Sequence, residues 1–349
     1  MEYRQLGRTG VKVSPLVLGC MNFGGRTAEA EANDIIERAL EAGINFIDTA
    51  NVYGHEPDNF QIGRGRSEEI VGKTLKQMGR RHNVVLATKA YFPMSDDPNA
   101  LGSSRRLLIE QCEASLYRLQ TDHIDLYQLH HPSNDIPIDE TLRALDDLVR
   151  AGKVRYIGTS SFAAWQVIES LWVSKEYRLN RFVCEQPAYN LLDRRLEREF
   201  VPMAQTYDIA IIPWSPTAGG FLSGAYQRGR IPPDESRFDV FWKSAATRHF
   251  TDAAFDVLEL VETLSNEKGC TSYQIALAWC MNQPGITSPI IGPRTVEHLQ
   301  SALQAIAVHI SAEDYQRIDV VAPPGRAVVP YYGYDGMAWV TWGPHKYRW

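Results

Sequence analysis

Eight short apolar runs, separated by longer amphipathic segments, are the feature of this sequence that most limits its fold. The runs are rich in Val and Ile and lie at residues 15–20, 45–50, 84–89, 125–130, 154–160, 182–187, 209–215 and 288–293. Continuous apolar runs of this length are typical of parallel strands that are buried on both faces. Eight such strands with helices between them predict an α/β fold, a (β/α)8 TIM barrel, for which about 250 residues are usual.

The segments between the runs carry helix signals. Apolar residues recur at helical spacing in residues 29–43, 67–79, 104–119, 138–152 and 162–172. Gly43 and Gly79 are expected to end the first two helices, and Ser67 is expected to cap the second one. No linker divides the chain, so we expect one domain over residues 1–349, with these additions to the barrel: a hairpin at 2–15 that closes its floor, a long loop at 216–250, a helix at 312–321 and an aromatic C-terminal tail at 322–349.

An open, doubly wound sheet is the alternative fold. It would need the pattern G-x-G-x-x-G after the first strand, and the segment LGCMNFGGR does not match that pattern. Gly72-Lys73-Thr74 resembles the end of a phosphate-binding loop, but Ser67 stands where that motif has its first glycine. The triplet also lies inside an expected helix, so the sequence favours the barrel.

Composition and charge argue against several classes of function. The formal net charge is −6 and the pI is about 5.9, which disfavours nucleic acid or an anionic membrane as the main partner. No secretory signal and no apolar stretch of the ~20 residues that a membrane helix needs are visible. The five cysteines are scattered without metal-finger spacing, so we expect no metal site and a reduced, cytoplasmic protein. The sequence leaves open whether the protein forms a homo-oligomer.

Four polar residues stand at or just after the ends of three successive runs. Asp48, Lys89 and His130 end the second, third and fourth runs, and Tyr53 follows Asp48 by five residues. The carboxyl ends of barrel strands share one face, so these side chains are expected to converge there. Any one of them alone is readily a packing or capping residue, but the four together favour a site.

The chemistry of these four groups is that of proton transfer. An ammonium favours the ionised form of a neighbouring phenol, and a carboxylate holds the ammonium in place. Tyr53 would then exchange a proton with a carbonyl oxygen that neutral His130 orients. None of the four transfers a hydride, so a cofactor has to supply it.

Several stretches carry a resemblance to a known family: YRQLGRTGVKVSPLVLG, NFIDTANVYG, SEEIVGKTL, VLATK, IDLYQLHHP, GKVRYIGTSSF, QPAYNLL, WSPTAGGFLSG and IIGPRTVEHL. Together they resemble the aldo-keto reductases along nearly the whole chain, in the branch of bacterial general reductases and potassium-channel β-subunits. The resemblance implies NADPH-dependent reduction of an aldehyde or ketone to an alcohol. It also implies that Tyr53 is the acid/base, that Lys89 and Asp48 tune it, and that His130 orients the substrate.

The resemblance further implies an NADP site along the barrel mouth. Its members are expected to hold the nicotinamide amide (Ser160, Ser161, Gln186), stack on the ring (Trp214), wrap the pyrophosphate (Ser215, Gly219, Gly220) and bind near the 2′-phosphate (Gly292, Arg294, His298). Ser161 stands where the family has Asn, and His298 stands where it has Gln or Arg. A 2′-phosphate held by an arginine favours NADP over NAD.

Large side chains near the strand ends are expected to line a pocket for a small carbonyl or alcohol substrate: Met21, Phe23, Tyr91, Phe92, Phe221, Phe241 and Trp242. The aromatic tail packs on the barrel, lines this pocket or meets another subunit; the sequence leaves these three open. Two other functions also stay open. One is a nucleotide-binding regulatory subunit of the channel-β type, and the other is an aldolase with Lys89 as Schiff base, against which the adjacent Asp48 argues.

Overall fold

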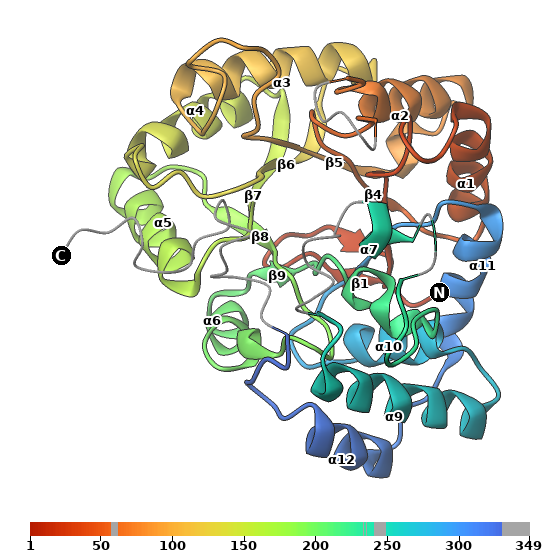
Figure 1. The fold of residues 1–349 in the computed structure, drawn as a ribbon. Coiled ribbons are helices and arrows are strands. Elements are labelled where there is room, and N and C mark those ends of the chain that lie inside the picture. Colours follow the sequence, from red (N-terminus) through yellow and green to blue (C-terminus); the bar gives the residue numbers. More distant parts are fainter. Residues whose placement is uncertain (57–61, 233, 235, 241–248, 330–349) are drawn as a thin grey trace.

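The chain folds into an α/β barrel, with parallel strands at the centre and helices around them (Figure 1). The computed structural model describes residues 1–56, 62–232, 234, 236–240 and 249–329. Within these residues eight strands form one parallel sheet in the order β10-β3-β4-β5-β6-β7-β8-β9. Their bounds are β3 Val17–Gly19, β4 Phe46–Asp48, β5 Val85–Ala90, β6 Ile124–Leu129, β7 Val154–Ser160, β8 Phe182–Gln186, β9 Ala210–Ile211 and β10 Ile290–Ile291.

The two outer strands of this sheet meet and close it. Ile211 of β9 forms a parallel bridge with Ile286, and the amide of Ile290 donates to the carbonyl of Pro213 at 2.8 Å. Each predicted apolar run overlaps one strand of the barrel, and the predicted (β/α)8 fold is confirmed. The open doubly wound sheet is wrong, because its edges would stay apart.

Most helices cover the outside of the barrel, whereas the short α7 lies over the strands (Figure 1). The helices are α1 Glu29–Glu41, α2 Arg66–Gln77, α3 Arg105–Leu119, α4 Ile138–Arg150, α5 Ala164–Tyr177, α6 Phe200–Tyr207, α7 Arg237–Val240, α9 Asp252–Lys268, α10 Ser272–Met281, α11 Val296–Gln304 and α12 Ala312–Val321, with short 3-10 turns at η1 Arg81–Asn83, η2 Arg195–Glu197, η3 Ala218–Ser223 and η4 Ala305–Ala307. No helix in the described part of the chain is long and apolar enough to span a bilayer.

The capping prediction for α2 is wrong. Gly65 precedes the helix as its N-cap, while Ser67 lies inside the first turn. The Ser67 hydroxyl donates to the carbonyl of Cys20 at 2.8 Å and pairs with the hydroxyl of Thr49 at 2.8 Å, so it ties the helix to two strand ends. The C-terminal end of α2 agrees with the prediction, since Gly79 takes a left-handed φ of 64° just beyond the helix.

The predicted hairpin closes one end of the barrel. β1 (Arg4–Gln5) pairs antiparallel with β2 (Lys12–Val13). Leu6 and Val13 are fully buried and pack on inward side chains at the strand starts, among them Phe46. Gly7 has a φ of 54°, and a Cβ there would lie 2.6 Å from the carbonyl oxygen of Val183. This close packing leaves the opposite end, at the carboxyl ends of the strands, for chemistry.

The long segment after β9 contributes to the core. Phe221 is fully buried and packs against Tyr226, Phe238, Phe250 and Phe255, with ring centroids 5.2–6.3 Å apart. The expectation that Phe221 lines a substrate pocket is therefore wrong, because this aromatic cluster encloses it. The candidates Phe241 and Trp242 lie outside the described residues, as does the tail from residue 330.

Candidate functional site

The site residues belong to rows of side chains that point into the barrel. Successive side chains of a strand alternate between its two faces, so every second residue points inward. In β4 the inward row passes from Phe46, in the core near the floor, to Asp48, and in β5 it passes from Ala87 to Lys89. The barrel is thus apolar at its closed end and polar at its mouth, where Asp48 ends β4, Lys89 lies one residue before the end of β5, and His130 directly follows β6.

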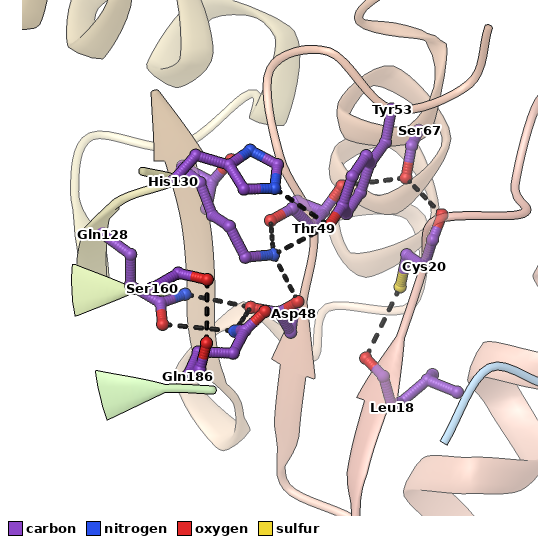
Figure 2. Close-up of polar contacts among 12 residues, drawn as sticks. Leu18, Cys20, Asp48, Thr49, Tyr53, Ser67, Gln128, His130, Ser160 and Gln186 are labelled. Atoms are coloured by element: carbon purple, nitrogen blue, oxygen red, sulfur yellow. Dashed lines mark hydrogen bonds and ion pairs between the residues drawn. The ribbon is translucent and has the colours of Figure 1, made fainter. Parts of the chain in front are cut away.

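Lys89 lies at the centre of this polar group (Figure 2). Its Nζ is 2.5 Å from Asp48 Oδ2, and it also donates to the carbonyl of Thr49 at 2.9 Å and to the hydroxyl of Tyr53 at 3.3 Å. Burial alone would lower the pKa of Lys89, but attraction to Asp48 and Tyr53 outweighs it and raises that pKa. The structure therefore joins a charged ammonium directly to the phenol.

Tyr53 is held over the mouth by the loop between β4 and α2. Its backbone carbonyl accepts hydrogen bonds from the amides of Gly65 and Ser67, at 3.1 and 3.3 Å. The next residue, Gly54, has a φ of 99°, and a Cβ at that position would lie 2.7 Å from the Cβ of Arg66. Only glycine fits this bend, so the loop returns Tyr53 to the strand ends five residues after Asp48.

His130 completes the predicted group. Its Nε2 lies 3.4 Å from the Tyr53 hydroxyl, and the ring of Phe92 packs on it edge-on at 4.9 Å. Burial, then the charge of Lys89 and the neighbouring His131, lower the pKa of His130 well below its usual range. The imidazole is therefore neutral at physiological pH, as the proposed orienting role requires.

Two buried amides surround the carboxylate. Asp48 Oδ1 accepts from Nε2 of Gln128 at 3.0 Å and from Nε2 of Gln186 at 2.9 Å, while Gln186 Nε2 lies 3.2 Å from Gln128 Oε1. The hydroxyl of Ser160 donates to the backbone carbonyl of Gln186 at 2.9 Å (Figure 2). Gln128 was missed by the sequence reasoning. Its signal is position: it lies two residues before His130, so strand alternation points it into the same mouth.

Backbone strain gathers at the ends of β7 and β9. Ser161 has a φ of 62°, Ser215 of 53° and Ala218 of 55°, in the left-handed region that side chains other than glycine disfavour. Gly219 and Gly220 continue the run with φ values of 68° and 93°. Strain of this kind collects at ligand sites, and turns that combine right-handed and left-handed residues make concave groups of N–H donors that bind anions. The segment therefore fits the pyrophosphate that the resemblance assigns to Ser215, Gly219 and Gly220.

The start of α11 is the third predicted cofactor region. Arg294 is exposed just before the helix, and Thr295 caps it by accepting from the amide of His298 at 3.3 Å. Glu31 of α1 accepts from the amide of Val296 at 2.9 Å. Two amides of the first turn of α11 thus already donate hydrogen bonds within the protein. The guanidinium of Arg294 carries the charge and the N–H donors that a phosphate requires.

The remaining predicted residues differ in exposure. Met21 and Tyr91 are partly exposed, and so is Trp214, whose amide donates to the carbonyl of Pro187 at 2.9 Å. Gly292 is exposed at the end of β10. Phe23 is fully buried in the hydrophobic core, so its assignment to a substrate pocket is wrong. It belongs to the same hydrophobic core cluster as Leu18 of β3 and Ile35 of α1.

A buried acid lies behind the strained turn at Ser161. Glu185 precedes Gln186 on β8, is fully buried, and accepts from the amide of Phe162 at 3.0 Å through Oε1. Its other oxygen has no hydrogen-bond partner among the described residues. Burial raises the pKa of Glu185 to about 8. The sequence analysis did not predict a role for Glu185, because it is one residue within the apolar run 182–187.

The arrangement is suited to moving a proton to or from an oxygen. A phenol that contacts an ammonium is a better acid than a free phenol, and a neutral imidazole beside it donates a hydrogen bond. None of these groups is a hydride donor, so redox chemistry needs a bound partner. Within the described residues, no cluster of His, Cys, Asp and Glu is arranged to hold a metal ion.

Comparisons with known proteins agree with this geometry. A model of the aldo/keto reductase family matches residues 15–323. The chain is 40% identical over 345 residues to the uncharacterized oxidoreductase YrpG of Bacillus subtilis (strain 168), covering 97% of this chain and 100% of that protein. It is 35% identical to a probable voltage-gated potassium channel subunit beta of Arabidopsis thaliana (88% and 92% covered) and 34% identical to versiconal hemiacetal acetate reductase of Aspergillus parasiticus (95% and 99% covered).

Proposed function

Because the chain belongs to the aldo/keto reductase family, we propose that it reduces an aldehyde or ketone reversibly to the alcohol, with NADPH as cofactor. The observation that carries this proposal is the position of Lys89, whose ammonium contacts both Asp48 at 2.5 Å and the hydroxyl of Tyr53 at 3.3 Å. That contact gives the phenol the charge partner that an acid near neutral pH requires.

In the proposed reaction Tyr53 donates its proton to the carbonyl oxygen of the substrate. Lys89 stabilises the phenolate that remains, and Asp48 keeps the ammonium charged and in place. Neutral His130 donates a hydrogen bond to the same oxygen and holds it near the phenol. Bound NADPH supplies the hydride to the carbonyl carbon. In the oxidation direction the phenolate takes the proton from the alcohol instead.

The cofactor assignment is part of the same proposal. Gln186 and Ser160 would hold the nicotinamide amide together with Ser161, and Trp214 would stack on the ring. The turn at 215–220, in which Ser215, Ala218, Gly219 and Gly220 are left-handed, would bind the pyrophosphate through backbone N–H groups. Arg294, exposed before α11, would bind the 2′-phosphate, which supports NADPH over NADH.

Replacing the phenol tests the proposal directly. Tyr53→Phe removes only the hydroxyl, so we expect kcat for aldehyde reduction to fall by about 10²–10⁴-fold, the usual contribution of a positioned acid. The Kd of NADPH, followed by its fluorescence, should change by less than about twofold, since Tyr53 makes no proposed cofactor contact. Tyr117→Phe, at an exposed position on α3, is the matched control. A Tyr53→Phe enzyme as fast as wild type would refute the acid assignment.

A nucleotide-binding regulatory subunit is the second candidate. It is favoured by the similarity to the plant protein described as a probable channel β-subunit. The intact group of Asp48, Tyr53, Lys89 and His130 favours the enzyme, because binding alone needs no tuned acid. NADPH binding without oxidation across a panel of aldehydes, together with co-purification of a channel protein, would favour the subunit.

The aldolase reading has less support. A Schiff base requires an uncharged amine as the nucleophile, and the pKa of Lys89 is raised rather than lowered.

A further inference from the structure

Gln128 takes no part in the proposed chemistry, yet it is fully buried at the centre of the site. It contacts two residues that do take part. Its Nε2 donates to Asp48 Oδ1 at 3.0 Å, and its Oε1 accepts from Gln186 Nε2 at 3.2 Å. A neutral amide that joins a catalytic carboxylate to a proposed cofactor contact suggests a link between the two.

The carboxylate fixes which way both amides point. Asp48 is in an ion pair with Lys89, and an ionised carboxylate oxygen only accepts hydrogen bonds. Both glutamines must therefore turn their Nε2 toward Asp48, and neither amide can be reversed without placing oxygen against oxygen. In this orientation Oε1 of Gln128 faces the second N–H of Gln186.

The consequence concerns the hydrogen bonds that Gln186 still has available. A glutamine amide carries two N–H donors, and here one goes to Asp48 at 2.9 Å and the other to Gln128 at 3.2 Å. Its Oε1 is the polar atom of the side chain that remains outside these bonds. Gln186 can thus accept a hydrogen bond from a ligand but has no N–H left to donate.

We propose that Gln128 is a positioning residue that makes Gln186 an acceptor-only contact for the cofactor. Gln186 then accepts from the NH2 group of the nicotinamide carboxamide and does not donate to its carbonyl oxygen. The same amide holds Asp48, so cofactor recognition and the orientation of the Asp48–Lys89 pair depend on one hydrogen-bond network. This inference rests on the proposed function, because it requires a nicotinamide cofactor at Gln186.

Two cofactor analogues separate the possible contacts. In 3-acetylpyridine-NADP⁺ a methyl ketone replaces the carboxamide, so the carbonyl acceptor stays and the NH2 donors are lost. In thio-NADP⁺ the NH2 stays and a weakly accepting sulfur replaces the oxygen. If Gln186 only accepts, the wild-type protein should bind the acetyl analogue about tenfold more weakly than the thio analogue, the loss of one hydrogen bond of about 1.4 kcal/mol. The ratio of the two Kd values, measured by titration calorimetry, is the quantity that the variants are then expected to change.

Gln128→Met then tests the role of Gln128. Methionine has a similar length but no amide, so one N–H of Gln186 is released and can donate to the ketone oxygen, though hardly to the thiocarbonyl. The ratio of the two Kd values should fall about tenfold, toward one. A merely structural loss would weaken both ligands alike and leave the ratio unchanged, which would overturn the proposal. Gln128→Leu repeats the test with a second apolar side chain.

Gln111→Met is the matched control. Gln111 is a buried glutamine of α3 that accepts from Asn51 at 3.1 Å and, within the described part of the chain, makes no hydrogen bond to Asp48 or Gln186. Its substitution removes an amide from the interior but should keep the wild-type ratio. The experiment distinguishes failure of this inference from failure of the proposed function. If the protein binds NADP⁺ and reduces carbonyls, but Gln128→Met keeps the wild-type ratio of Kd values, the role of Gln128 is wrong and the proposed function stands.

Discussion

Glu185→Gln should make the protein less sensitive to alkaline pH, because it removes a buried acid that resists ionisation. Glu185 lies behind Ser161 and Phe162, with one oxygen bonded to the Phe162 amide at 3.0 Å and the other without a hydrogen-bond partner among the described residues. Glutamine is nearly isosteric and keeps that acceptor. The substitution therefore changes the ionisation behaviour of the site far more than its packing.

The magnitude follows from the shifted pKa. Burial raises the pKa of Glu185 from 4.5 to about 8. Between these values the unfolded chain loses the proton while the folded protein keeps it, so unfolding releases a proton and stability falls as pH rises. Each unit is worth about 1.36 kcal/mol, so wild type should lose roughly 3–4 kcal/mol at this residue between about pH 5 and pH 8. This loss of stability is absent below the pKa of Glu185 in the unfolded chain and reaches its full size above the pKa of Glu185 in the folded protein.

Urea unfolding followed by circular dichroism at several pH values between about 5 and 9 measures this effect. The free energy of unfolding of Glu185→Gln, minus that of wild type, should rise with pH by the amount above and then level off. Glu169→Gln, at an exposed position of α5, removes a carboxyl of the same kind and should give a difference that does not change with pH. A pH-independent difference for Glu185→Gln would show that the buried carboxyl is ionised, or solvated, in the folded protein.

Two further substitutions test other parts of the structure. Arg294→Ala should raise the Kd of NADPH at least about tenfold more than that of NADH, because only NADPH offers the 2′-phosphate; equal losses, measured by fluorescence titration, would contradict that contact. Gly72→Ala should lower the free energy of unfolding by about 1–2 kcal/mol despite better helix propensity, since the new Cβ would lie 2.4–2.5 Å from backbone atoms of Leu119. Gly10→Ala, which meets no atom within 4 Å, is its control in urea unfolding, and a Gly72→Ala protein as stable as wild type would refute the packing argument.

Much of the fold followed from the sequence because the strands of this barrel are buried on both faces. Each strand is a continuous apolar run, and the polar residues at its end mark where it emerges at the mouth. Asp48 and Lys89 were found in this way, since a charge directly after an apolar run needs a partner. The helix ends at Gly43 and Gly79 followed from the left-handed turns that only glycine adopts easily.

What the sequence missed depends on contacts between distant segments. Ser67 matches a helix cap locally, but strand ends on both sides offer its hydroxyl better partners. Phe23 follows a strand just as a pocket residue would, and only its complete burial in the hydrophobic core shows otherwise. Gln128 of β6 and Gln186 of β8 meet inside the barrel from positions 58 residues apart, a pairing that spacing along the chain does not reveal.

The buried ion pair at the mouth is hard to explain by stability. Moving an ammonium and a carboxylate out of water costs several kcal/mol per ion, and apolar residues in their place often give an equally stable protein. Asp48 and Lys89 are nevertheless enclosed by Gln128, Gln186 and a backbone carbonyl, so that every oxygen and most protons of the pair are bonded. Lys89 makes one further contact, to the hydroxyl of Tyr53. The effect of the ammonium on this phenol explains why the protein keeps a buried ion pair that is costly for its stability.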